Sequence, residues 1–120
     1  MFASLVLAGC AHTGPVTVAW SFEGIQEGYD HPTRVQVFVD GAPVAESSVT
    51  LQSEPNKVEV PLEPGAHMLK VVNFAQYEGS WEEHTVANDY AIDCVWEGEV
   101  TPSTRKVDLV FDIDEGTRRK

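Results

Sequence analysis

Lys106-Val-Asp-Leu-Val-Phe-Asp-Ile113 alternates apolar residues with mostly polar ones along its whole length. Successive side chains of a β-strand point to opposite faces of a sheet, so this period of two places one apolar face on a core. The same period recurs in four other stretches, at 16–22, 34–39, 57–62 and 90–97. We therefore expect a chain built from strands.

Turn-forming residues separate these stretches. Asp40-Gly41 predicts a hairpin, and the Pro-Gly pair at 64–65 predicts a second turn. Two more strands are expected at 44–51 and 67–77, which brings the total to about seven. This pattern is typical of an all-β, antiparallel β-sandwich of the immunoglobulin-like or transthyretin-like kind, and we expect the domain to span residues 16–115. The expected core residues are Val18, Trp20, Val37, Val60, Leu69, Ile92, Trp96, Leu109 and Phe111.

Two segments depart from the alternation. Ser80-Trp-Glu-Glu83 has the spacing of a capping box, which predicts a loop with one helical turn over 81–87. Residues 116–120, Gly-Thr-Arg-Arg-Lys, predict a frayed basic tail at the C-terminus.

The N-terminal segment predicts a processing signal. Residues 2–9 are uncharged and mostly apolar, and Leu7-Ala-Gly-Cys10 resembles the lipobox of bacterial lipoproteins. The resemblance implies that residues 1–9 belong to a signal peptide, that Cys10 is acylated, and that residues 10–15 form a tether. No basic residue precedes Cys10 and the apolar stretch is short, so we expect the natural start to lie upstream. The alternative is a short buried strand in which Cys10 is an ordinary apolar residue.

Two stretches of the body resemble PEGA domains, small β-sandwich modules of bacterial surface proteins. Val37-Phe-Val-Asp-Gly-Ala-Pro-Val44 is similar to the strand and Asp-Gly hairpin of that family. Val60-Pro-Leu-Glu-Pro-Gly-Ala-His-Met-Leu-Lys-Val71 is similar to its later Pro-Gly turn and strand, although residues 47–56 between them are longer than usual. The resemblance implies an extracytoplasmic, non-catalytic adhesion or scaffold module.

The charge balance narrows the choice of partners. The 120 residues carry 19 acidic and 8 basic side chains, a formal net charge of −11. Nucleic acids are bound mainly through Lys and Arg, so a nucleic-acid partner is disfavoured, and so is direct adsorption to anionic lipid. Solubility is the simplest reading of this acidity.

The sequence shows no catalytic or metal-binding signature. The four histidines are scattered, and no nucleophile elbow, phosphate loop or dinucleotide fingerprint is present. Cys94 is expected to be a small buried hydrophobe, with a Cys10–Cys94 disulfide as the alternative. Carboxylates of the 93–97 and 108–115 segments would converge on a Ca²⁺ ion only if those two strands paired, and their usual role is to keep a sheet soluble. We therefore expect a non-enzymatic protein without cofactor or metal.

Three aromatic residues in expected loops are the candidate binding residues, Tyr29, Tyr77 and Trp81. They lie in the loops 23–31 and 76–85, where a ring either contacts a ligand or covers the end of the core. The expected function is a lipid-anchored envelope protein, at the outer membrane by resemblance of Ala11 to the lipoprotein sorting pattern, that binds a protein partner or acts as a scaffold. The alternative is a carbohydrate- or peptidoglycan-binding module. A cleft of aromatic residues at one end of the sandwich favours the carbohydrate, and a flat apolar patch or an open edge strand favours the protein.

Overall fold

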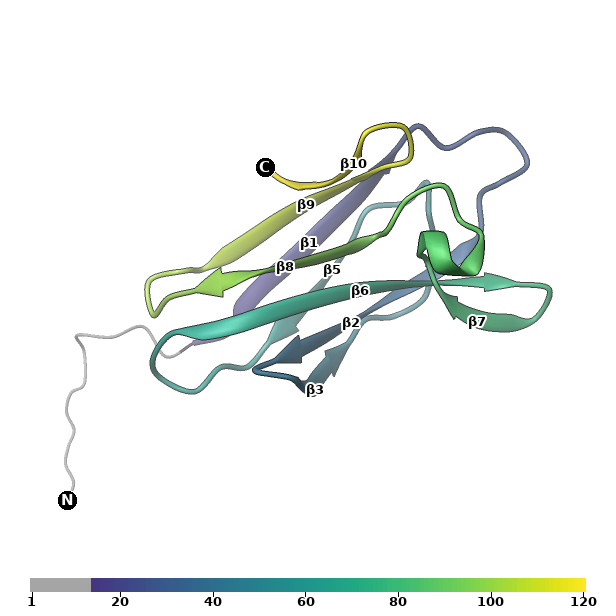
Figure 1. The fold of residues 1–120 in the computed structure, drawn as a ribbon. Coiled ribbons are helices and arrows are strands. Elements are labelled where there is room, and N and C mark those ends of the chain that lie inside the picture. The colour runs from purple at the N-terminus through teal and green to yellow at the C-terminus, as the bar shows by residue number, and fades with distance from the viewer. Residues whose placement is uncertain (1–13) are drawn as a thin grey trace, which may run out of the picture.

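The computed structural model describes residues 14–120, and within them the chain folds into two β-sheets packed as a sandwich (Figure 1). The predicted all-β sandwich is confirmed, but it has ten strands rather than seven. Cys10 and the segment interpreted as a signal peptide lie outside the described residues. The elements are β1 (Val16–Glu23), β2 (Pro32–Val39), β3 (Ala42–Glu46), β4 (Thr50–Leu51), β5 (Asn56–Val60), β6 (His67–Tyr77), β7 (Ser80–Glu83), the short 3₁₀ helix η2 (Val86–Asn88), β8 (Val95–Val100), β9 (Lys106–Asp112) and β10 (Gly116–Arg119).

The first sheet has the strand order β10-β9-β1-β5. β1 pairs antiparallel with β5, where Val18 lies opposite Val58. On its other side β1 pairs parallel with β9, where Trp20 lies opposite Leu109. The sandwich is therefore not wholly antiparallel as predicted, because its first and ninth strands run in the same direction.

The second sheet has the order β3-β2-β6-β7, with β4 beside β2 and β8 beside β6. β7 and β8 follow each other along one edge of β6, and the chain that connects them leaves the sheet. Between the stretches of β6 that pair with β7 and with β8, the backbone amide of Asn73 donates to the Cys94 carbonyl (3.0 Å). The backbone carbonyl of Asn73 accepts from the His84 amide (2.9 Å). The backbone amide of Cys94 also donates to the His84 carbonyl (2.7 Å). This bond joins the two ends of residues 84–94, the segment that leaves the sheet and is called the excursion below. Residues 85–93 therefore project as one loop from this edge.

Apolar side chains from both sheets fill the space between them. Of the nine predicted core residues, seven are buried, and the remaining two, Ile92 and Trp96, are partly buried against the same cluster. Cys94 is also fully buried in it, as the sequence predicts, although it immediately precedes β8 rather than lying within a strand. Phe111 is the largest of the fully buried side chains.

Hairpin geometry explains one additional strand, β7. Glu78 and Gly79 both have positive φ angles (51° and 83°), as the two central residues of a type I′ turn do. The turn folds Ser80–Glu83 back onto β6, with Trp81 opposite Gln76. The predicted capping box is therefore wrong, since backbone pairing with β6 overrides a helical turn that would have been marginal alone. By contrast, the predicted Asp40-Gly41 hairpin is confirmed, with φ angles of 50° and 88°.

The C-terminal residues form β10 and not the predicted frayed tail. Asp112 Oδ1 accepts the backbone amides of Asp114 (3.0 Å) and Glu115 (3.2 Å), which holds a tight turn after β9. These bonds are the main reason that the pKa of Asp112 is lowered. The Arg118 guanidinium then donates to Asp112 (3.2 Å) and to Glu23 on β1 (3.2 Å). Arg118 is thus tied to acidic groups on the first sheet, and the Arg119 guanidinium donates to the Lys106 carbonyl (3.3 Å).

The remaining differences from the sequence prediction are local. The expected strand at 44–51 divides into β3 and β4, and the strand expected from residue 90 begins only at Val95. β8 and β9 belong to different sheets, so the strand pairing on which a convergent calcium site depended does not exist. No group of three or more potential metal ligands occurs among residues 14–120. Within the same residues no helix is long and apolar enough to cross a membrane.

Candidate functional site

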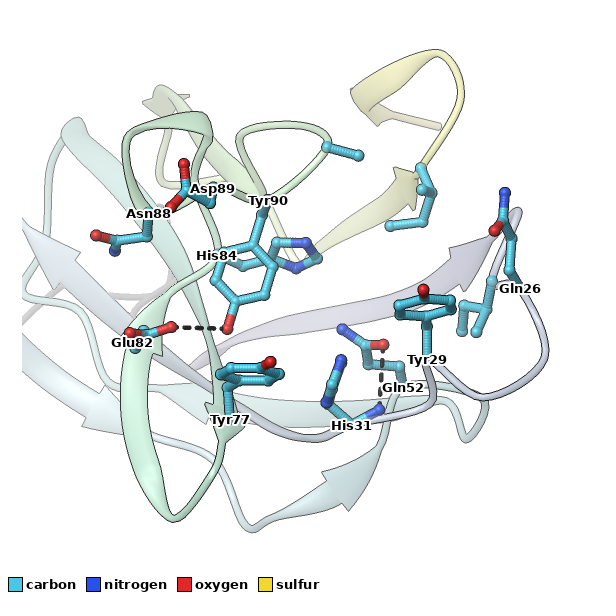
Figure 2. A pocket seen from close by; sticks show the side chains of 13 residues that line it. Gln26, Tyr29, His31, Gln52, Tyr77, Glu82, His84, Asn88, Asp89 and Tyr90 are labelled. Carbon is cyan, nitrogen blue, oxygen red and sulfur yellow. Dashed lines mark hydrogen bonds between the residues drawn. The ribbon is translucent and has the colours of Figure 1, made fainter.

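A pocket of about 570 Å³ lies at the end of the sandwich where β1 ends and β2 begins (Figure 2). This volume is within the range of small-molecule sites. Three segments enclose it, the β1–β2 connection, the β6–β7 hairpin and the 84–91 part of the excursion, with contributions from Gln52 and Ile113. Two of these segments contain the loops predicted from the sequence to carry binding residues.

The floor of the pocket is a part of the inner face of the second sheet. Thr33 on β2 lies opposite Ala75 on β6, and Ala75 lies opposite Glu82 on β7, so all three share one face of the sheet. Thr33 and Ala75 are buried, which identifies this face as the inner one. Tyr77, two residues after Ala75, has the same orientation. The inner face of the second sheet extends past the ends of β1 and β9, which belong to the first sheet. In this part it carries polar and aromatic groups and no longer the aliphatic side chains of the core.

Tyr29 and Tyr77 are the exposed aromatic residues of the pocket. Their side chains are 63% and 50% exposed, so neither ring is a cover over the core. His31 lies beside Tyr77 in a T-shaped arrangement, with the ring centroids 5.9 Å apart. Figure 2 shows Tyr77, His31 and Tyr29 along one wall and Tyr90 and His84 on the facing side. The arrangement is an open cleft bordered by aromatic rings.

His84 forms the buried wall of the pocket. The residue is only 3% exposed, and its ring stacks on Phe22 (6.1 Å between centroids) and contacts Tyr90 edge to face (4.4 Å). Burial, with a smaller contribution from His31, lowers the pKa of His84 from 6.5 to about 4. The ring is therefore neutral at neutral pH. Its Nδ1 is buried and has no hydrogen-bond partner among the described residues.

Two tyrosines of the pocket remain protonated under ordinary conditions. The Tyr90 hydroxyl donates to Glu82 Oε1 (3.1 Å), and burial together with this bond raises the pKa of Tyr90 to about 12. A hydrogen bond with Glu78 is the main cause that raises the pKa of Tyr77. Both phenols therefore present neutral rings and hydroxyl groups to a ligand. Glu82 in turn is held in place by the Tyr90 hydroxyl.

Polar groups that suit hydroxyl ligands complete the lining. Gln52 Oε1 accepts from the backbone amide of His31 (3.3 Å), and the backbone amide of Gln52 donates to the His31 carbonyl (3.0 Å), so Gln52 is held beside His31 by both its side chain and its backbone. Gln26 and Asn88 add further amide groups from the two flanking loops. Amides both donate and accept hydrogen bonds, which is the property needed to recognise a polyol.

Trp81, the third predicted binding residue, lies outside this pocket. It follows Ser80 and precedes Glu82 on β7, so it points to the outer face of the sheet. There the Arg34 guanidinium lies 5.0 Å from the Trp81 ring centroid and 4.7 Å from that of Phe74. Trp81 therefore belongs to a stack on the outer surface and has no place in the pocket lining.

The other pocket residues were not predicted individually from the sequence, although three of them, His31, Glu82 and His84, lie in the predicted loops. His31 and His84 are 53 positions apart in the chain (84 − 31), and only the closure of the 84–94 excursion on β6 brings them to one site. The sequence predicts that Tyr90 lies in a strand and that Glu82 lies in a helical turn. Of these residues, Glu82 alone has a sequence signal, because Glu78-Gly79 predicts a hairpin that places it on the inner face.

Comparison with known proteins finds no matching family model, no similar curated protein and no similar solved structure.

Proposed function

We propose that this chain is a lipid-anchored, non-catalytic envelope module that binds a carbohydrate in the pocket at the end of its sandwich. The observation that carries the proposal is the aromatic cleft, in which Tyr29 and Tyr77 are half-exposed or more beside fixed amide groups. Sugar rings present flat C–H faces and a rim of hydroxyls, so they stack on aromatic rings and hydrogen-bond to amides and carboxylates. A concave aromatic site of this kind favours the carbohydrate over a flat protein interface.

The polarity of the chain supports an anchored arrangement. The proposed tether, residues 10–15, joins the start of β1, whereas the pocket lies where β1 ends. At about 3.3 Å per residue, the eight residues of β1 separate the tether from the pocket by about 25 Å. A lipid on Cys10 would thus leave the pocket facing away from the membrane, accessible to a glycan of the envelope.

The pocket chemistry supports binding without catalysis. No Ser, Thr, Cys or Lys lines the pocket, so the described residues offer no hydroxyl, thiol or amine nucleophile of these types there. The carboxylates of Glu82 and Asp89 are the remaining candidates for chemistry on a sugar, and intact recovery of the bound saccharide is the test of a purely binding role. Cys94 is buried in the core, and burial raises the pKa of its thiol, which makes it unreactive.

Calorimetric titration of the purified protein with a panel of neutral, acidic and amino-sugar oligosaccharides tests the proposal. At least one saccharide should bind and be recovered intact. Tyr29→Ala and Tyr77→Ala should each weaken its binding about three- to tenfold, since an aromatic contact contributes about 0.5–1.5 kcal/mol. Neither should change the melting temperature, because both rings are exposed. Trp81→Ala is the matched control, an aromatic residue of the same hairpin outside the pocket, and should leave affinity unchanged.

Three outcomes would contradict the proposal. Absence of binding across the panel would refute the proposal that the ligand is a carbohydrate. Cleavage of a bound oligosaccharide would refute the proposal that the module is non-catalytic. Equal loss of affinity in Trp81→Ala would place the site elsewhere. For the anchor, Cys10→Ala in the full-length gene should shift the protein from the detergent phase to the aqueous phase, and unchanged partitioning would refute acylation at Cys10.

A further inference from the structure

The fixed charges that line the pocket are negative. Glu82 and Asp89 contribute carboxylates, and no Lys or Arg is among the lining residues. His84 stays neutral because burial lowers its pKa to about 4. The chain as a whole carries a formal charge of −11, so its field adds to the local attraction for a cation. An anionic sugar would enter this site against both contributions.

The aromatic rings add to the same preference. The face of a neutral tyrosine ring is the negative pole of its quadrupole and attracts an ammonium group within about 6 Å. Tyr29 and Tyr77 are exposed beside the pocket, and the Tyr90 hydroxyl holds one oxygen of Glu82 at 3.1 Å. The second oxygen of Glu82 makes no hydrogen bond to the described residues, which leaves it free for a ligand.

His84 adds a neutral polar ring to the wall of the same pocket. His84 is 97% buried on the pocket wall (100 − 3), yet its Nδ1 has no partner among the described residues. Two atoms of the core, Trp20 Nε1 and Asn73 Oδ1, are unpaired in the same way, so the state of Nδ1 is not specific to the pocket. A neutral imidazole has one donor and one acceptor nitrogen, which suits a hydroxyl group better than a second cation. The His84 ring therefore suits a hydroxyl group, and the carboxylates of Glu82 and Asp89 suit a positive charge.

We propose that the saccharide bound in this pocket carries a free amino group, as in glucosamine-type sugars, with its ammonium at Glu82 and Asp89 and its ring against Tyr29 and Tyr77. This inference rests on the proposed carbohydrate function. It specifies that acidic sugars are excluded, and that acetylation of the amine, which removes the positive charge, weakens binding.

The test is calorimetric titration with glucosamine oligomers and with N-acetylglucosamine oligomers of the same length, at a slightly acid pH where the free amines are protonated. Wild-type protein should bind the free-amine oligomer about tenfold more tightly, which is the scale of a charge-assisted hydrogen bond. The preference should fall as salt is raised, because the interaction is electrostatic.

Two conservative variants test whether the carboxylates of Glu82 and Asp89 recognise the ammonium group of the ligand. Glu82→Gln keeps an oxygen for the Tyr90 hydroxyl, and Asp89→Asn suits the positive φ (70°) of that residue. Each should lose most of the preference for the free amine, so that the ratio of the affinities for the two oligomers approaches one. Glu83→Gln is the matched control, since it removes the same charge from the exposed outer side of β7 and should retain the preference.

The outcomes separate the two proposals. Equal or tighter binding of the N-acetyl oligomer would overturn the amino-sugar inference and leave the carbohydrate function standing. An undiminished preference in both Glu82→Gln and Asp89→Asn would overturn the assignment of these carboxylates. Failure of every oligosaccharide to bind would overturn the inference together with the function on which it rests.

Discussion

The titration of His84 links the pocket wall to the stability of the whole domain. Burial beside Phe22 and Tyr90 lowers its pKa from 6.5 to about 4, so the folded chain resists protonation that the unfolded chain accepts. The unfolded state therefore binds more protons between these values, and stability is full above pH 6.5 and falls as the pH drops toward 4. At about 1.4 kcal/mol per pH unit, the loss over this interval is about 3 kcal/mol. That is a large fraction of the 5–15 kcal/mol typical of a small domain.

Urea unfolding of the wild type and of His84→Gln, at pH 7.5 and at pH 4, measures this contribution. Other groups titrate equally in both proteins, so the wild type should lose about 3 kcal/mol more than the variant. His67→Gln serves as the control, because the pKa of His67 is raised and its contribution has the opposite sign. Equal losses in the wild type and His84→Gln, or an NMR titration that places His84 near 6.5, would refute the reasoning.

Three further predictions concern the core and one hairpin. Cys94 should react with a thiol reagent only after unfolding, since burial raises the pKa of its thiol; rapid labelling of the native protein would show that the core is open there. Phe111→Ala should reduce the free energy of urea unfolding by about 3–5 kcal/mol, and a loss below about 1 kcal/mol would exclude it from the core. Asp40→Asn should lower the NMR-measured pKa of His67, because the Asp40 carboxylate bonds to His67 Nδ1 (2.7 Å); an unchanged pKa would mean that this pair does not form in solution.

Those parts of the fold that depend on side-chain alternation could be predicted from the sequence. Alternation identified the long strands and most of the core, because a period of two places one face inward whatever the neighbouring strand is. It carries no information on which strands pair. The parallel pairing of β1 with β9 and the separation of β8 from β9 were therefore out of reach.

Short strands without an apolar face were missed for a related reason. β10 is held by the Asp112 turn and by the ion pairs of Arg118, neither of which leaves an apolar pattern. β7 follows a Glu-Gly turn, a weaker signal than Asp-Gly because Glu seldom adopts a positive φ. In both cases tertiary contacts decided the structure of a polar segment.

The candidate site was predicted only in part. The two loops and the exposed tyrosines Tyr29 and Tyr77 could be selected because large aromatics near glycines in polar segments are candidates for contact. Trp81 met the same criterion but points to the outer face, a distinction that depends on the register of β7 with β6. His84 and Tyr90 reach the site through the 84–94 excursion, whose closure on Asn73 has no sequence pattern of its own.

Two-dimensional amide NMR during titration with the amino-sugar oligomer tests the central claim most directly, since it reports where a ligand binds. We expect the shift changes to be confined to residues 25–31, 77–91 and Gln52, the segments that enclose the pocket. β3, at the opposite edge of β2 from β6, should remain unaffected. Shift changes centred on β3, or none in the pocket segments at saturating ligand, would contradict the account.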